Sequence, residues 1–308
     1  MSDLERHLEN YLVLRRGLGY KLDRAGRLLA QLAAFCDRSG AEVVSVELAV
    51  SWATSPPSCS AMWAANRLCV ARGFLRYLHA FDPRTGVPPT KLLPSAPTRA
   101  TPYLYSHEEV AALMSAARSF RSRLRAAGME AVVGLLAGSG MRIGEALSLD
   151  RGDVDLASGV ITIRRAKLDR ERMVPLHDTS VEALGVYVDE RDRLSPRPSE
   201  TAFFVSAAGT RMRYCNFHVA YQQMVRLAGI TARSASCRPR PHDLRHRFAV
   251  NTLEDWYRQG ADVAALLPRL STYLGHVDPA ATYWYLSGSL DLLGLAAERL
   301  EIVYEAKR

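Results

Sequence analysis

His242-Asp243-Leu244-Arg245-His246 is the stretch that most constrains the fold of this chain, and it follows Pro239 and Pro241 closely. Prolines just ahead of a helical pattern indicate a helix start, so His242 and Arg245, three residues apart, share one face of the helix. Taken alone, the stretch has an ordinary explanation, a capped helix with a salt bridge. The motifs on either side decide between this explanation and a functional one.

Upstream, the motif Gly140-Met141-Arg142-Ile143-Gly144-Glu145-Ala146-Leu147 follows the turn Gly138-Ser139-Gly140. This turn predicts that Arg142 lies at the start of a helix over residues 144–149. Arg142 and Glu145 are then spaced for an ion pair. Exposed pairs of this kind are common and contribute little to stability, so this motif alone does not indicate a function.

Two strands are predicted between these motifs, Val160-Ile161-Thr162-Ile163 and Met173-Val174-Pro175-Leu176. The connection between them carries Lys167 and is rich in charge. Its other basic residues are Arg164, Arg165, Arg170 and Arg172. Such a hairpin tip is usually solvated surface. Lys167 therefore indicates a function only in combination with the other motifs.

Downstream, Leu274-Gly275-His276 precedes Thr282-Tyr283-Trp284-Tyr285. Aromatic residues in this pattern commonly belong to a core, and a lone histidine beside them is commonly a buried, hydrogen-bonded one. Tyr285 stands nine residues after His276.

The combined order Arg, Lys, His-x-x-Arg, His, Tyr resembles the tyrosine recombinase, or phage integrase, family, which includes lambda integrase, Cre and the Xer recombinases. The resemblance covers roughly residues 103–290. The residues that match the family's catalytic positions are Arg142, Lys167, His242, Arg245, His276 and Tyr285. The resemblance implies a site-specific recombinase or integrase that cleaves and rejoins DNA through a 3′-phosphotyrosine intermediate. It implies no metal, nucleotide or other cofactor.

The residue types suit this chemistry. Arg142 and Arg245 present permanently charged forks that match phosphate oxygens, which is the electrostatic task of a metal ion. Lys167 is expected to donate a proton to the departing oxygen as general acid. His242 can assist deprotonation of the tyrosine, and His276 can orient the phosphate.

The nucleophile has two candidates, since Tyr283 offers a second hydroxyl near Tyr285. Spacing from His276 favours Tyr285. On a helix, side chains two residues apart point about 200° from one another, so only one of the two can face the phosphate. The stretch between Arg245 and His276 is also longer than the family resemblance leads us to expect, and Pro268 lies in the extra sequence.

The chain of 308 residues is long enough for two domains. Helical spacing over residues 4–81 predicts a helical DNA-binding (core-binding) domain at residues 1–90. A proline-rich linker follows at 91–102, and an α+β catalytic domain with a C-terminal helix at 103–308. The pattern Ser106-His107-Glu108-Glu109 is a capping box that predicts a helix start. The fold class is therefore mainly α with a small β-sheet.

The charge balance fits a polyanionic partner without proving one, since 40 Lys and Arg oppose 32 Asp and Glu for a net charge of +8. The N-terminal domain, with its segment at residues 15–20, is more loosely similar to the family's core-binding domain. The residues expected to contact DNA there are Arg15, Arg16, Lys21, Arg67 and Arg72.

Five cysteines without a CxxC motif indicate free thiols in a reducing compartment. No apolar run approaches the roughly 18 residues of a membrane span. We therefore expect a cytoplasmic, nucleoid-associated protein.

The expected partners are a double-stranded recombination site and three further copies of the chain, forming a homotetramer on synapsed DNA. The apolar tail 290–300 either docks on a neighbouring copy or packs on its own domain. Three other functions stay open from the sequence. They are a strand-relaxing enzyme like a type IB topoisomerase, a DNA-binding accessory protein without activity, and a basic helical scaffold whose motifs match the family by coincidence.

Overall fold

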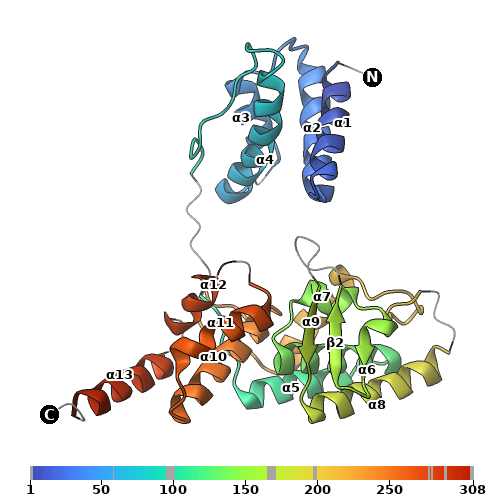
Figure 1. Cartoon of the computed structure of the whole chain (residues 1–308). Helices are drawn as coiled ribbons and strands as arrows, with labels where there is room; N and C mark the ends of the chain where they lie inside the picture. The colour runs from blue at the N-terminus through green and yellow to red at the C-terminus, as the bar shows by residue number, and fades with distance from the viewer. Residues whose placement is uncertain are drawn as a thin grey trace. The chain divides into compact units, whose positions relative to one another are not determined.

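The computed structural model describes residues 3–57, 59–94, 101–164, 171–196, 200–276, 278, 280–287 and 290–305. The chain divides into two compact units, Met1–Arg99 and Ala100–Arg308 (Figure 1). The division falls within the proline-rich segment 91–102. Each unit buries a hydrophobic core of its own.

The N-terminal unit is helical, as predicted. Its helices are α1 (Asp3–Gly17), α2 (Asp23–Ser39), α3 (Val46–Thr54) and α4 (Ala61–His79). Leu32, Trp52 and Phe74 are at most 1% exposed and lie in its core. The starts of α3 and α4 are capped by serine hydroxyls, which accept hydrogen bonds from backbone N–H groups that have no partner within the helix.

The C-terminal unit is mainly helical with one small sheet. Its helices are α5 (His107–Arg118), α6 (Arg123–Ser139), α7 (Ile143–Ser148), η1 (Arg151–Asp153), α8 (Asp178–Leu194), α9 (Tyr214–Leu227), α10 (Asp243–Arg258), α11 (Val263–Leu274), α12 (Ala280–Tyr283), η2 (Trp284–Ser287) and α13 (Leu290–Glu305). Its strands are β1 (Val154–Asp155), β2 (Val160–Ile163) and β3 (Arg172–Pro175).

The sheet is antiparallel in the order β1-β2-β3, and Ile163 pairs with Arg172 where the charged connection leaves and returns. The two predicted strands are therefore confirmed. The predictions missed β1, because two residues are too few to show the alternation that marks a strand.

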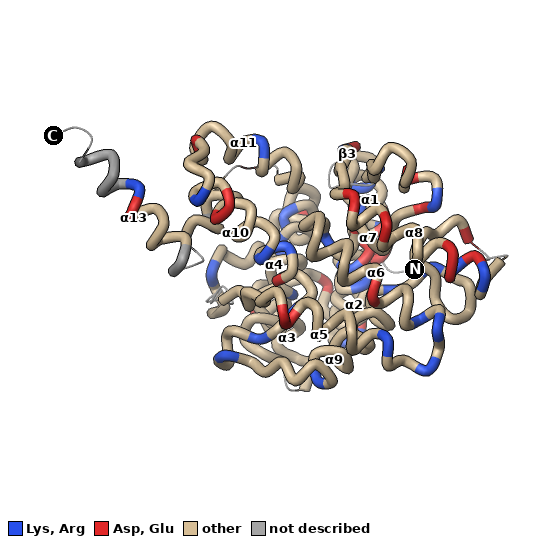
Figure 2. Tube along the Cα trace, turned by 90° about the horizontal axis from the view of Figure 1, so that it is seen from below, with Lys and Arg blue, Asp and Glu red and all other residues tan. Residues whose placement is uncertain are grey.

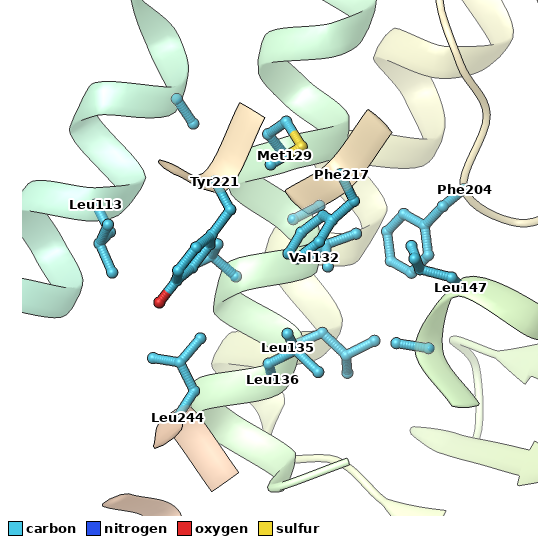
Figure 3. Packing of buried hydrophobic residues seen from close by; sticks show 14 of the residues in the cluster. Leu113, Met129, Val132, Leu135, Leu136, Leu147, Phe204, Phe217, Tyr221 and Leu244 are labelled. Carbon is cyan, nitrogen blue, oxygen red and sulfur yellow. The ribbon is translucent and has the colours of Figure 1, made fainter. Parts of the chain in front are cut away.

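Helix α6 is the central element of the C-terminal core. Met129, Val132, Leu135 and Leu136 are at most 2% exposed, and they project on more than one side of the helix (Figure 3). A helix that is apolar all round must be surrounded by other elements. Figure 3 shows the surrounding side chains, Leu113 of α5, Phe217 and Tyr221 of α9 and Leu244 of α10. This core fixes the end of α6 and the start of α10 relative to each other.

The predicted capping box is confirmed at the start of α5. The Ser106 hydroxyl accepts a hydrogen bond from Glu109 N at 3.1 Å, and Glu109 Oε2 accepts one from Ser106 N at 2.8 Å. The turn predicted at residues 138–140 begins later in the structure. Helix α6 continues through Ser139, and the chain turns at Gly140, where φ is 62°.

The long stretch after α10 forms helix α11, with Pro268 inside it. Helix α13 follows and is fastened to its own unit, since Leu292 is 1% exposed and Arg299 Nη2 donates to the Gly260 carbonyl at 3.0 Å. The described part of the chain contains no helix long and apolar enough to cross a membrane.

We predict that Leu32→Ala destabilises the N-terminal unit by about 2–5 kcal/mol, because it leaves a cavity at a fully buried position. Hydrogen exchange followed by mass spectrometry should show faster exchange in α2 and α4. The control Leu14→Ala, at a position that is 54% exposed, should change stability by less than about 0.5 kcal/mol. Equal losses in both variants would contradict the assigned core.

Candidate active site

Arg142 and Arg245 lie where the C-terminal ends of two helices meet. Arg142 is the N-cap residue of α7, and Arg245 is in the first turn of α10. Arg245 donates from Nη1 to the Gly140 carbonyl at 2.9 Å and from Nη2 to the Leu274 carbonyl at 2.8 Å. Arg142 Nη2 donates to the Gly275 carbonyl at 2.9 Å. The last carbonyls of α6 and α11 therefore hold both guanidinium groups, as expected where a helix end leaves acceptors without a partner.

Glu145 is the buried counter-charge of this cluster, with 8% of its surface exposed. Its carboxylate accepts hydrogen bonds from Arg142 Nη1 at 2.8 Å and from the Arg142 backbone N at 2.9 Å. It also accepts two from Arg172, at 2.9 and 2.8 Å. Burial alone would raise the pKa of Glu145, but the hydrogen bonds from Arg172 and Arg142 outweigh burial and lower the pKa to about 2. Glu145 therefore belongs to a buried network, and the alternative of a merely exposed ion pair does not hold.

His276 links Arg245 to the segment that carries the tyrosines. Its Nε2 lies 2.8 Å from Arg245 Nη2, and its Nδ1 lies 2.7 Å from the Thr282 hydroxyl. Because a guanidinium only donates, Nε2 must accept and Nδ1 must carry the proton. Burial, followed by the charges of Arg245 and Arg142, lowers the pKa of His276 to about 4, so the ring is neutral at pH 7.

His242 and His246 stand one helical turn apart at the start of α10, with ring centroids 4.8 Å apart. His242 keeps contact with solvent. Desolvation of its ring, and then the charges of Arg245 and Arg142, lower its pKa to about 4. His246 was not among the site residues expected from the sequence. Its position four residues after His242, on the same helical face, was the available signal.

The two tyrosines differ sharply in their surroundings. Tyr285 is 3% exposed, whereas Tyr283 is 55% exposed. The Tyr285 ring lies 5.3 Å from the His246 ring and 6.0 Å from the His276 ring, measured between centroids. Burial lowers the pKa of Arg245 and the Tyr285 side chain opposes that shift, so Tyr285 lies close to the guanidinium. The structure therefore brings Tyr285, and not Tyr283, to the arginine cluster.

Lys167 lies outside the described residues. The described chain leaves β2 at Ile163 and resumes just before Arg172, the first residue of β3. Arg172 is 13% exposed and bonded to Glu145, so at least this arginine of the charged connection is not solvated surface.

The expected DNA contacts of the N-terminal unit need a correction. Arg67 is 5% exposed, donates to the Trp52 carbonyl at 2.7 Å, and has its guanidinium 4.1 Å from the Trp52 ring centroid. Arg72 donates to the carbonyls of Pro88 and Pro89. These contacts give both side chains structural roles, and burial argues against a DNA contact by Arg67. Arg16 and Lys21 are exposed.

Charge alone does not mark a DNA-binding face. In the view of Figure 2, basic and acidic residues are mixed along the tube, for instance in α8, where Asp189 and Glu190 neighbour Arg191 and Arg193. The arginine cluster with its histidines and Tyr285 is a more specific feature than the net charge.

We predict how the protonation of His242 and His276 depends on pH. Each is neutral when folded and has a folded pKa near 4, below the ordinary value of 6.5. Their contribution to stability is complete above pH 6.5 and is lost as pH falls toward 4, because the unfolded chain binds protons first. NMR titration of the DNA-free protein should give midpoints near pH 4 for both rings. Midpoints near 6.5 would contradict the described environment.

The model of the phage integrase family matches residues 104–289. The chain is 40% identical over 311 residues to a putative integrase/recombinase, y4rB, of Sinorhizobium fredii, covering 99% of each chain. The fold is similar to that of the XerH site-specific recombinase bound to a palindromic difH substrate in a post-cleavage complex. For that structure the TM-score is 0.62 and the identity 21%, over 89% of this chain and 78% of that one.

A lambda integrase tetramer bound to a Holliday junction is also similar, with a TM-score of 0.60 and 15% identity, over 92% of this chain and 76% of that one. The family model covers more than half of the 308 residues, and the relative from Sinorhizobium fredii covers nearly all of them. The chain therefore belongs to the phage integrase family, and it is a tyrosine site-specific recombinase.

Proposed function

We propose that this recombinase cleaves one DNA strand by attack of the Tyr285 hydroxyl on a backbone phosphorus, and that the product is a 3′-phosphotyrosine with a free 5′-hydroxyl. The observation that carries the proposal is the position of Arg245. Its guanidinium lies 2.8 Å from His276 Nε2, and the Tyr285 ring packs against the His276 ring, so a phosphate held by Arg245 would lie beside the nucleophile. The exposed Tyr283 has no comparable support.

In the cleavage step, a bond forms between the tyrosine oxygen and phosphorus while the bond from phosphorus to the 5′ oxygen breaks. Negative charge grows on the non-bridging oxygens, where Arg142 and Arg245 would stabilise it. Because the arginines supply this charge, we expect cleavage to need no metal ion and no nucleotide. A 5′-hydroxyl of a second strand then attacks the phosphotyrosine, releases Tyr285 and rejoins the DNA.

Two proton transfers accompany the step. The tyrosine hydroxyl must lose its proton, and a neutral His242 can accept one. A pKa near 4 makes His242 a weak base in the DNA-free protein, but a bound phosphate would offset the arginine charges and raise that pKa. Lys167 would donate the proton that the departing 5′ oxygen needs.

The proposed partners are a double-stranded recombination site and further copies of the chain. The tetramer on a Holliday junction formed by lambda integrase supports assembly on DNA. We propose that Arg15, Arg16 and Lys21 contact DNA phosphates. We also propose that the tail contributes to assembly through residues after Arg299, the last residue of α13 described in contact with its own unit. We also propose a cytoplasmic, nucleoid-associated location, because the proposed substrate is DNA.

The function can be tested without knowing the target sequence. A library of nicked duplexes with a randomised centre is incubated with the protein, and adducts resistant to denaturant are isolated and sequenced. A recovered sequence then defines a suicide substrate and a plasmid test. Exchange between two sites supports recombination, whereas relaxation of a one-site plasmid without exchange would favour a topoisomerase-like activity. Failure to recover any adduct would refute the proposed cleavage.

The nucleophile is tested with a matched pair of variants. Tyr285→Phe should bind DNA and fold normally, but adduct formation should fall by about 10³-fold or more, because the attacking oxygen is gone. Tyr283→Phe should still form the adduct. Mass spectrometry of the trapped complex should place the DNA on Tyr285, and a modified Tyr283 would show that the assignment is wrong.

The general acid is tested with an altered leaving group. Lys167→Ala should slow cleavage of ordinary DNA by about 10²–10⁴-fold, since the 5′ oxygen departs without a proton. A substrate with sulfur at the 5′ bridging position should restore the rate, because a thiolate leaves unprotonated. Equal impairment on both substrates would remove Lys167 from this role.

A further inference from the structure

Arg172 contacts two segments of the site at once. It is the first residue of β3, and its side chain is 13% exposed. Two of its nitrogens donate to the two oxygens of Glu145, at 2.9 and 2.8 Å, and Nε donates to the Tyr273 carbonyl at 3.2 Å. A Cβ atom placed on Gly275 would lie 2.6 Å from Arg172 Nη1, so the guanidinium packs directly on the backbone of this turn.

Through these contacts Arg172 adjoins the supports of two groups in the site, Arg142 and His276. Glu145 holds Arg142 through its guanidinium and through its backbone N–H, so Arg172 fixes the carboxylate that fixes Arg142. The turn at Gly275 supplies a carbonyl to Arg142 and leads directly into His276. A bidentate arginine can hold the carboxylate plane in one orientation, which a lysine cannot do equally well.

We propose that Arg172 is a positioning residue for strand cleavage, which holds Arg142 through Glu145 and His276 through the turn at residues 273–275. The inference rests on the proposed function above. Arg172 does not touch the DNA phosphate in this proposal. Its contribution is the placement of Arg142, which would bind the phosphate, and of His276, which is hydrogen-bonded to Arg245.

The test compares Arg172→Met with Arg164→Met in the full chain, using the nicked duplex recovered by adduct selection. Arg164 is a fair control because it is an arginine of the same connection and pairs with Asp153 instead of Glu145. We expect the single-turnover rate of adduct formation at saturating DNA to fall by about 100-fold in Arg172→Met, since small displacements of positioned groups cost this much. DNA affinity should stay close to that of the wild type in both variants.

Arg172→Lys provides a second variant in case Arg172→Met fails to fold. It keeps one positive charge beside Glu145 but loses the fork, so we expect a rate between those of the wild type and Arg172→Met. Rates for Arg172→Lys and Arg172→Met that equal the Arg164→Met rate would overturn the inference while leaving the proposed function intact. A wild-type protein that forms no adduct would instead overturn the proposed function, and the inference with it.

A pH profile separates positioning from a general loss of stability. The charged groups that face Glu145 are Arg142 from the start of α7, Arg172 from β3 and Arg245 from α10. Without Arg172, burial is less opposed and the pKa of Glu145 rises from about 2 toward ordinary values. The adduct rate of Arg172→Met should therefore fall more steeply between about pH 6 and about pH 4 than the wild-type rate does, because this window spans the ordinary carboxyl pKa. Parallel profiles would contradict the proposed link through Glu145.

Discussion

Three guanidinium groups, those of Arg142, Arg172 and Arg245, gather around one buried carboxylate, and the site depends on this balance of charge. Burial and the neighbouring Arg142 lower the pKa of Arg245 to about 10, which records the electrostatic cost of the arrangement. Glu145 alone cannot neutralise three positive charges. The remaining compensation comes from the carbonyls at the ends of α6 and α11, whose partial negative charge faces the arginines.

Two glycines make these helix ends available. Gly140 and Gly275 both have positive φ, 62° and 68°, a conformation that side chains other than glycine rarely adopt. Both also have a close neighbour, since an added Cβ would lie 2.5 Å from the Phe248 ring at Gly140 and 2.6 Å from Arg172 at Gly275. The glycines ahead of Arg142 and His276 are thus explained by the turns that aim carbonyls at the arginine cluster.

The site residues Arg142, His242, Arg245 and His276 could be predicted from the sequence because each lies at or beside a recognisable helix start or end. The role of Arg172 was not accessible, since nothing in a charge-rich connection distinguishes a solvated arginine from one that folds back onto a carboxylate 27 residues away in sequence. Arg67 was misjudged for a different reason. It is three residues after Ala64 and four before Ala71, both at most 5% exposed, so its position falls on the apolar stripe of α4. The spacing of Arg67 from these two alanines therefore indicates that Arg67 faces the core.

The preference for Tyr285 over Tyr283 rested on spacing and on the opposed directions of nearby side chains. In the structure the two tyrosines do not share one α-helix, because α12 ends at Tyr283 and Tyr285 lies in the following 3-10 turn. In this arrangement one ring is buried against His246 and His276 while the other is exposed. The sequence could not fix the burial, which depends on how α10 and the His276 turn pack together.

The same charge balance connects DNA binding to protonation. In the DNA-free protein, burial and then the positive charges of Arg245 and Arg142 keep His242 and His276 neutral, with pKa values near 4. A phosphate bound between Arg142 and Arg245 would introduce the negative charge that the cluster lacks, so it would raise both histidine pKa values and bring them closer to neutrality. Under the proposed mechanism, the arginines would then recognise the phosphate and, by that binding, make the histidines better bases. Phosphate binding would then by itself change the protonation of the site, and no conformational change of the fold would be needed for it.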